Sequence, residues 1–250
     1  MSKIEEYRHK LSNLSDWDEF LLENSGLPGP RGNLELAQAV ADLGTPQLFE
    51  RYRAYHAGVA PTGSPYEFLA FCGVLGLGRL LAEGQVEVLP VLRAFASDPR
   101  WRLREAVAMA LQRFGDADMP SLIHEMQSWS MGSPLEQRAA AAALCEPRLL
   151  SRGEHAHAVL LILDRIMNSI LEQPHRRAED FRILRQGLGY CWSVAVASDP
   201  EDGKALMEKW LINPDPDIQW IMHENLKKNR LARMDADWVH LWQVRKGEKS

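Results

Sequence analysis

The stretch "SDPRWRLREAVAMALQRFGD", residues 97–116, decides the fold class of this chain. It opens with Asp98, a helix-capping residue, and Pro99, which suits the first helical position because no amide partner is needed there. Apolar residues then recur at spacings of three and four: Leu103, Val107, Ala110, Leu111 and Phe114. This spacing predicts an amphipathic helix that begins near residue 99 and ends before Gly115.

The same start signal, a Ser, Thr or Asp followed by proline, recurs along the chain. It stands at Thr45-Pro46, Ser64-Pro65, Asp98-Pro99, Ser133-Pro134, Asp199-Pro200 and Asp215-Pro216. Ser64 with Glu67 and Ser133 with Glu136 have the spacing of capping boxes. Alternation of polar and apolar residues, the pattern of strands, does not extend beyond a few positions. We therefore predict an all-α chain of about twelve helices, joined mostly by short connections that favour antiparallel pairs.

The helix pairs show a degenerate repeat. Residues 85–96 form an amphipathic helix directly before the opening stretch, and two such helices bury their apolar faces by stacking on neighbouring pairs. The pattern of the second helix returns in "SPLEQRAAAAAL", residues 133–144, in "FRILRQGLGYCWSVAVA", residues 181–197, and in "DPDIQWIMHENLKKN", residues 215–229. These recurrences predict a repeat architecture.

Residues 85–115 resemble a HEAT repeat, and residues 116–145 resemble one less closely. The resemblance implies a right-handed α-solenoid of about six HEAT-like helix pairs with a concave inner face. In that family an arginine near the start of the second helix commonly pairs with an aspartate of the neighbouring repeat. Carried over, Arg104 and Arg138 would hold repeats in register, whereas Gln219 replaces the arginine near the C-terminal end.

Three regions are predicted from charge and turn residues. The first 50 residues carry four Lys/Arg against nine Asp/Glu, and the glycine- and proline-rich segment 25–33 reads as a loop. We predict an acidic N-terminal helical cap and loop over residues 1–32 and the HEAT-like array over residues 33–245. A disordered tail is expected over residues 246–250.

Composition argues against several classes of protein. The formal net charge of −5 gives no global basic surface for nucleic acid, so any such surface must be a local patch. The three cysteines lie far apart without paired spacing, which argues against disulfides and zinc. The N-terminus lacks the apolar core of a signal peptide, and Arg79 interrupts the longest apolar stretch. We expect a cytoplasmic protein that does not contact membranes.

Candidate binding residues follow from the repeat. Arg104, Arg138 and Arg185 would form a row along the concave face, suited to phosphates or to an acidic partner segment. Further candidates for that face are Trp192, Trp220, Lys227 and Arg230. Each has a structural alternative: the arginines as contacts between repeats, the tryptophans as core, and the cations as partners of a helix dipole. Sequence alone leaves both readings open.

No catalytic motif stands out, and no cofactor is expected. His155 and His157 are two positions apart and point in different directions on a helix, so no metal site is expected. The sequence favours a non-enzymatic scaffold that binds a protein partner on its concave face. The alternative is a DNA-binding or DNA alkylation-repair protein, since size, helical pattern and tryptophan content are similar to those of bacterial HEAT-like alkylpurine DNA glycosylases. That resemblance implies a cationic groove with aromatic residues and a carboxylate.

Overall fold

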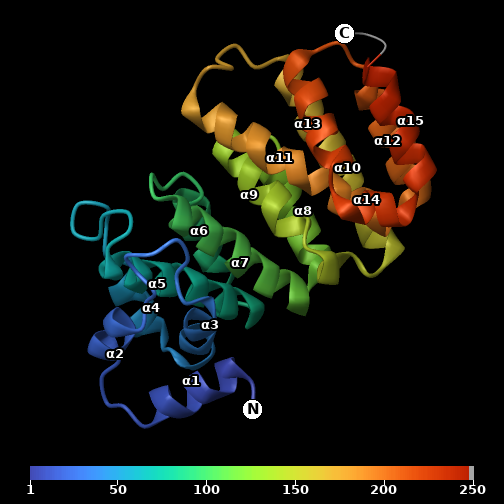
Figure 1. Cartoon of the computed structure of the whole chain (residues 1–250). Coiled ribbons are helices and arrows are strands. Elements are labelled where there is room, and N and C mark those ends of the chain that lie inside the picture. Colours follow the sequence, from blue (N-terminus) through green and yellow to red (C-terminus); the bar gives the residue numbers. More distant parts are fainter. Residues whose placement is uncertain (248–250) are drawn as a thin grey trace. The chain divides into compact units, whose positions relative to one another are not determined.

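A computed structural model describes residues 1–247 of the chain (Figure 1). Within these residues the protein has fifteen α-helices, two short 3-10 helices and no strand, which confirms the predicted all-α class. The described residues form two compact units, residues 1–117 and residues 118–247. The first helix packs on the third within the first unit, and the predicted boundary after residue 32 stays a prediction. Each unit is described by itself.

The first unit is built around one long helix, α5 (Pro65–Ala82), which packs against α2, α3, α4, α6 and α7. Its other elements are α1 (Lys3–Ser12), α2 (Asp18–Glu23), α3 (Leu34–Leu43), α4 (Pro46–Arg53), η1 (Val86–Val88), α6 (Leu89–Phe95) and α7 (Trp101–Ala117). Among the described residues, α5 alone is long and apolar enough to cross a bilayer, but 78% of it is buried inside the protein. Burial to that extent is typical of a core helix.

Close approach between α5 and α7 depends on a glycine. A Cβ atom built on Gly78 would lie 2.5 Å from the Cα and carbonyl oxygen of Ala110. The two backbones are therefore in direct contact, with no room for a side chain at position 78. Small alanine side chains on this face of α7 also allow the two helices to approach closely.

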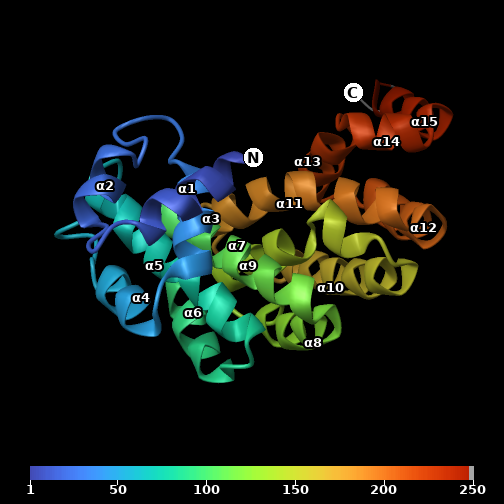
Figure 2. The ribbon, with the colours of Figure 1, turned by 90° about the horizontal axis from the view of Figure 1, so that it is seen from below.

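The second unit is built around α11 (Glu179–Ser198), which packs against α9, α10, α12, α13 and α14. Its other elements are α8 (Met119–Trp129), α9 (Pro134–Leu144), η2 (Pro147–Leu150), α10 (Gly153–Leu171), α12 (Pro200–Leu211), α13 (Pro216–Leu226), α14 (Asn229–Met234) and α15 (Ala236–Gly247). Figure 2 shows α14 and α15 beside α13 at the C-terminal end of the unit.

Both units share one order of contacts. Successive helices pair, as α4 with α5 and α10 with α11, and alternate helices stack, as α5 on α3 and α7 and α11 on α9 and α13. This order is compatible with a helical repeat, in which each pair buries its apolar faces against its neighbours.

Several local predictions can be compared with the helix boundaries. Ser133 and Glu136 form the predicted capping box. At Ser64 only half of the box forms, because the Glu67 carboxylate accepts hydrogen bonds from elsewhere. Helix α7 begins at Trp101, two residues later than predicted. Of the predicted tail, residues 246–247 belong to α15, and residues 248–250 lie outside the described part of the chain.

Candidate functional site: an aromatic pocket beside a buried ion pair

The arginines of the opening stretch are turned into the first unit. Arg100 is 2% exposed and donates hydrogen bonds to the carboxylate of Asp98 at 2.8 Å. It also donates to the backbone carbonyls of Tyr55 at 2.8 Å and Ala60 at 3.2 Å. The guanidinium therefore ties the start of α7 to the loop that follows α4, and the Asp98–Arg100 pair displaces the start of the helix.

Arg104 is also buried. Its Nη1 donates to the backbone carbonyls of Asp98 at 2.6 Å and Pro99 at 3.1 Å. These bonds satisfy two carbonyl groups in the turn before α7. Because the helix begins only at Trp101, these carbonyls accept no hydrogen bond from the helix backbone. Arg104 thus supports the turn before its own helix, and little of its surface faces solvent.

Arg102 forms a buried ion pair with α5. Its Nη1 lies 3.2 Å from Oε2 of Glu67, whose side chain is 0% exposed, and its Nη2 donates to the carbonyl of Gly29 at 2.8 Å. Glu67 Oε2 also accepts from the amide of Gly63 at 2.7 Å. One arginine therefore joins α7, α5 and the loop that precedes α3, and it neutralises a carboxylate inside the unit.

A pocket of about 240 Å³ lies against this ion pair. Its walls are mainly apolar and come from Leu27, Leu34, Phe68, Phe71, Trp101 and Met109. Arg31, Arg102 and Glu105 complete the lining. The Arg102 guanidinium lies 4.5 Å from the centre of the Trp101 ring, which is 45% exposed. The ion pair therefore positions an exposed tryptophan at a concave apolar site.

The second unit holds the other predicted binding residues, and several have partners there. Arg185 lies 4.1 Å from the centre of the Trp220 ring, and its Nε lies 3.0 Å from Oδ1 of Asp217. Asp217 also pairs with Arg176 at 3.3 Å. Arg185 and Trp220 thus belong to a network between α11, α13 and the preceding loop, and their role on a concave binding face stays a prediction.

Trp192 does not reach the surface. Its side chain is 0% exposed, so the indole belongs to the core of the second unit and cannot be a surface contact in this structure. Arg138 is half-buried, and its Cγ packs near Gly187, 3.2 Å from the position a Cβ would take there. The predicted row of Arg104, Arg138 and Arg185 spans both units and stays a prediction.

Lys227 and Arg230 lie near the end of α13 and in α14. Lys227 is exposed and pairs with Glu224 at 2.5 Å. Arg230 contacts the hydroxyl of Tyr190 and lies 4.8 Å from the centre of its ring, and Lys228 lies 5.9 Å from the same ring. Tyr190 was not among the predicted site residues, because an exposed tyrosine in a helix carries no local motif.

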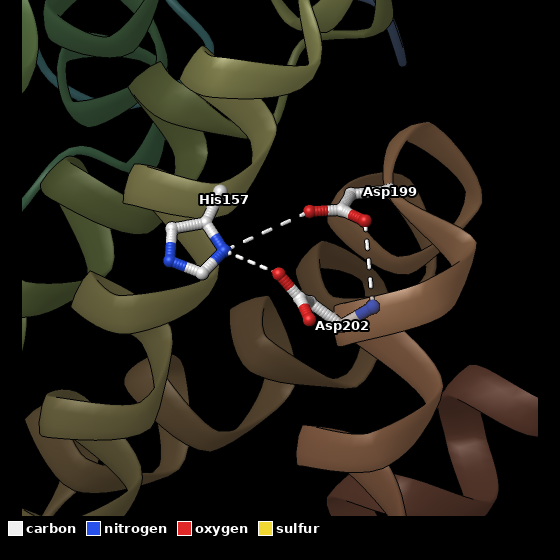
Figure 3. Close-up of side chains that lie close together, drawn as sticks. All are labelled: His157, Asp199 and Asp202. Atoms are coloured by element: carbon white, nitrogen blue, oxygen red, sulfur yellow. Dashed lines mark hydrogen bonds and ion pairs between the residues drawn. The ribbon is translucent and has the colours of Figure 1, made fainter.

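One group of side chains has the composition of a metal site. His157 on α10 faces Asp199 and Asp202 at the start of α12 (Figure 3). Its Nδ1 lies 2.7 Å from Oδ2 of Asp202 and 3.9 Å from Oδ2 of Asp199. From the sequence, His157 was weighed only together with His155, and no metal site was expected. The aspartates follow more than 40 positions later, and only the pairing of α10 with α12 brings them close.

Comparison with known proteins gives no relative from which a function could be transferred. No family model matches the sequence, and neither a curated protein nor a solved structure is significantly similar to the chain. The function must therefore be argued from the sites themselves.

Proposed function

We propose that this protein is a helical-repeat binding protein, and that the pocket beside Trp101 captures one bulky apolar side chain of a partner protein segment. The observation that carries the proposal is the pocket itself: a concave apolar site with an exposed tryptophan at its wall. Aromatic side chains in such positions dominate binding energies at protein interfaces.

The size of the pocket favours a side chain over a drug-sized molecule. Small-molecule sites usually measure about 300–1,000 Å³, and this pocket is smaller. An apolar cavity of about 150 Å³ holds a benzene molecule, so a volume of about 240 Å³ has room for a Phe, Leu, Met or Trp side chain. We propose such a side chain, presented by a peptide segment, as the occupant.

The order in which the helices pack on one another supports the repeat architecture in this proposal. Successive helices pair and alternate helices stack in both units, as the HEAT-like reading of residues 85–115 expects. Proteins of that architecture use their stacked helices as extended binding surfaces. A HEAT-like, right-handed array of about six pairs is therefore the architecture we propose.

The burial of the arginine cluster favours a protein partner over nucleic acid. Arg100, Arg102 and Arg104 are each at least nine-tenths buried and hold backbone carbonyls or carboxylates of the first unit. A phosphate backbone needs cations that reach into solvent. This cluster therefore gives the DNA alternative no support, although it first suggested a basic patch.

The test is selection of peptide ligands on the full-length protein. A phage library of 12-residue peptides is panned, and the enriched peptides are measured by fluorescence polarisation. We expect a shared large apolar residue in these peptides, and at least about a tenfold loss of affinity for Trp101→Ala. Tyr66→Ala is the matched control, since Tyr66 is equally exposed in the same unit but does not line the pocket.

Two outcomes would contradict the proposal. Peptides that bind wild type and Trp101→Ala equally well would show that the pocket is not the site. Salt-dependent binding of duplex DNA at low ionic strength, without enrichment of any peptide, would favour the nucleic-acid alternative.

A further inference from the structure

We propose that His157, Asp199 and Asp202 form a binding site for a divalent transition-metal ion of the Zn²⁺ class. The site lies in the second unit and does not depend on the proposed function of the pocket in the first. Its three donor groups are contributed by two helices: the imidazole by α10, and both carboxylates by the first turn of α12 and its cap.

The local structure of α12 orients both carboxylates. Asp199 is the N-cap residue, and its Oδ1 accepts the amide of Asp202 at 3.4 Å, which directs Oδ2 toward the imidazole. Figure 3 shows the histidine on one side and the two aspartates facing it from the other helix. The capping bond therefore fixes one donor, and Asp202 brings the second into the same space.

The spacing of the donor atoms suits one ion. All three atoms lie within 4.8 Å of one another, and the two distances from His157 Nδ1 are 2.7 and 3.9 Å. In a tetrahedral site, ligand bonds of about 2.1 Å place the donors about 3.4 Å apart. The 2.7 Å distance is a hydrogen bond and the other distance is 3.9 Å, so the two lie on either side of that value. His157 and Asp202 are half exposed and can adjust by side-chain rotation.

Charge also favours a bound cation. Two carboxylates face a single imidazole, and within the described residues no lysine or arginine lies within 4.0 Å of either carboxylate. The group therefore carries excess negative charge, which a divalent ion would neutralise. The imidazole selects the class of ion, since nitrogen donors suit Zn²⁺, Cu²⁺ or Ni²⁺, whereas Ca²⁺ and Mg²⁺ prefer oxygen alone.

Isothermal titration of the full-length protein with ZnCl₂ tests the site. We expect one ion per chain, and at least about a tenfold loss of affinity in both variants: His157→Gln removes the imidazole nitrogen, and Asp202→Asn replaces a charged carboxylate with a neutral amide oxygen. CaCl₂ should bind far more weakly than ZnCl₂. Circular dichroism checks that each variant is folded. We expect folded variants, because both side chains are half exposed.

Two control variants separate this site from general surface charge. Glu201→Gln removes a negative charge from the same turn of α12, and His124→Gln removes another exposed histidine of the same unit. Both should bind Zn²⁺ as wild type does. The proposal is overturned if wild type shows no Zn²⁺ binding, or if His157→Gln binds as tightly as wild type. It is equally overturned if Glu201→Gln weakens binding as much as Asp202→Asn, since the group would then act only as diffuse negative charge.

Discussion

Replacing Arg102 with methionine should destabilise the first unit more than any change at an exposed arginine. Methionine keeps an apolar stem against Trp101 but removes the charge that faces Glu67. The Glu67 carboxylate, 0% exposed, would keep only the amide of Gly63 as a partner. Removing one member of a buried ion pair costs about 3–5 kcal/mol, because the remaining charge is neither solvated nor paired.

Hydrogen exchange measured by mass spectrometry gives the size of this effect within the first unit. A loss of about 4 kcal/mol corresponds to roughly a thousandfold faster exchange for the slowest amides of α5 and α7. Arg31→Met is the matched control, since Arg31 lines the same pocket but is mostly exposed and its ion pair with Glu35 spans 3.8 Å. An exposed pair of this kind contributes at most about 1 kcal/mol.

The double variant Arg102→Met/Glu67→Met identifies the cause of the loss. With both charges removed and the volume roughly kept, most of the stability should return. Two results would refute the reasoning: an Arg102→Met protein as stable as the Arg31→Met control, or a double variant no more stable than Arg102→Met alone.

Three further predictions concern packing, pH and thiol chemistry. Gly78→Ala places a methyl group against the backbone of α7 and should cost at least about 2 kcal/mol, read as a lower thermal midpoint. Gly153→Ala, where nothing lies within 4 Å, should leave the midpoint unchanged or slightly higher. Partial burial raises the pKa of Asp215, but the hydrogen bond from Arg176 and those from backbone amides outweigh it and hold the pKa below its ordinary value. Asp215 therefore stabilises the folded state above pH ~4, and this stabilisation is lost as the pH falls through its lower folded-state pKa. The thermal midpoint of Asp215→Asn should depend less on acidic pH than that of wild type. Equal pH dependence in the two proteins would contradict this prediction. Burial raises the pKa of the Cys72 thiol, so Ellman's reagent should not modify it in the native protein at pH 8, and fast labelling before unfolding would contradict its buried position.

Helix positions were predictable because caps and prolines act locally. Ser64-Pro65, Ser133-Pro134 and Asp215-Pro216 all begin helices where the sequence places them. The exception is Asp98-Pro99. There the Asp98 carboxylate accepts hydrogen bonds from the amide and the guanidinium of Arg100, two residues later, so the helix does not begin at Pro99. A local competitor of this kind is hard to weigh from sequence alone.

The sites were less predictable because their partners are distant in the sequence. Arg102 meets Glu67 across 35 positions, and His157 meets Asp202 across 45. One signal was present: Glu67 stands at the start of a long apolar run, and a charge on a helix that is apolar nearly all round requires a partner. That Arg102 is the cation paired with Glu67 depends on how α5 packs on α7, and residue spacing in the sequence does not predict this packing.

The most direct test of the pocket is methyl NMR of methionine in the full-length protein. Met109 lines the pocket, and its ¹³C-labelled methyl signal is assigned with Met109→Leu. Titration with indole, a stand-in for an aromatic anchor side chain, should shift the Met109 signal in a saturable manner and leave the fully buried Met126 of the second unit unmoved. A Met109 signal that does not move at millimolar indole, or one that moves no more than Met126, would contradict a pocket that accepts an apolar anchor.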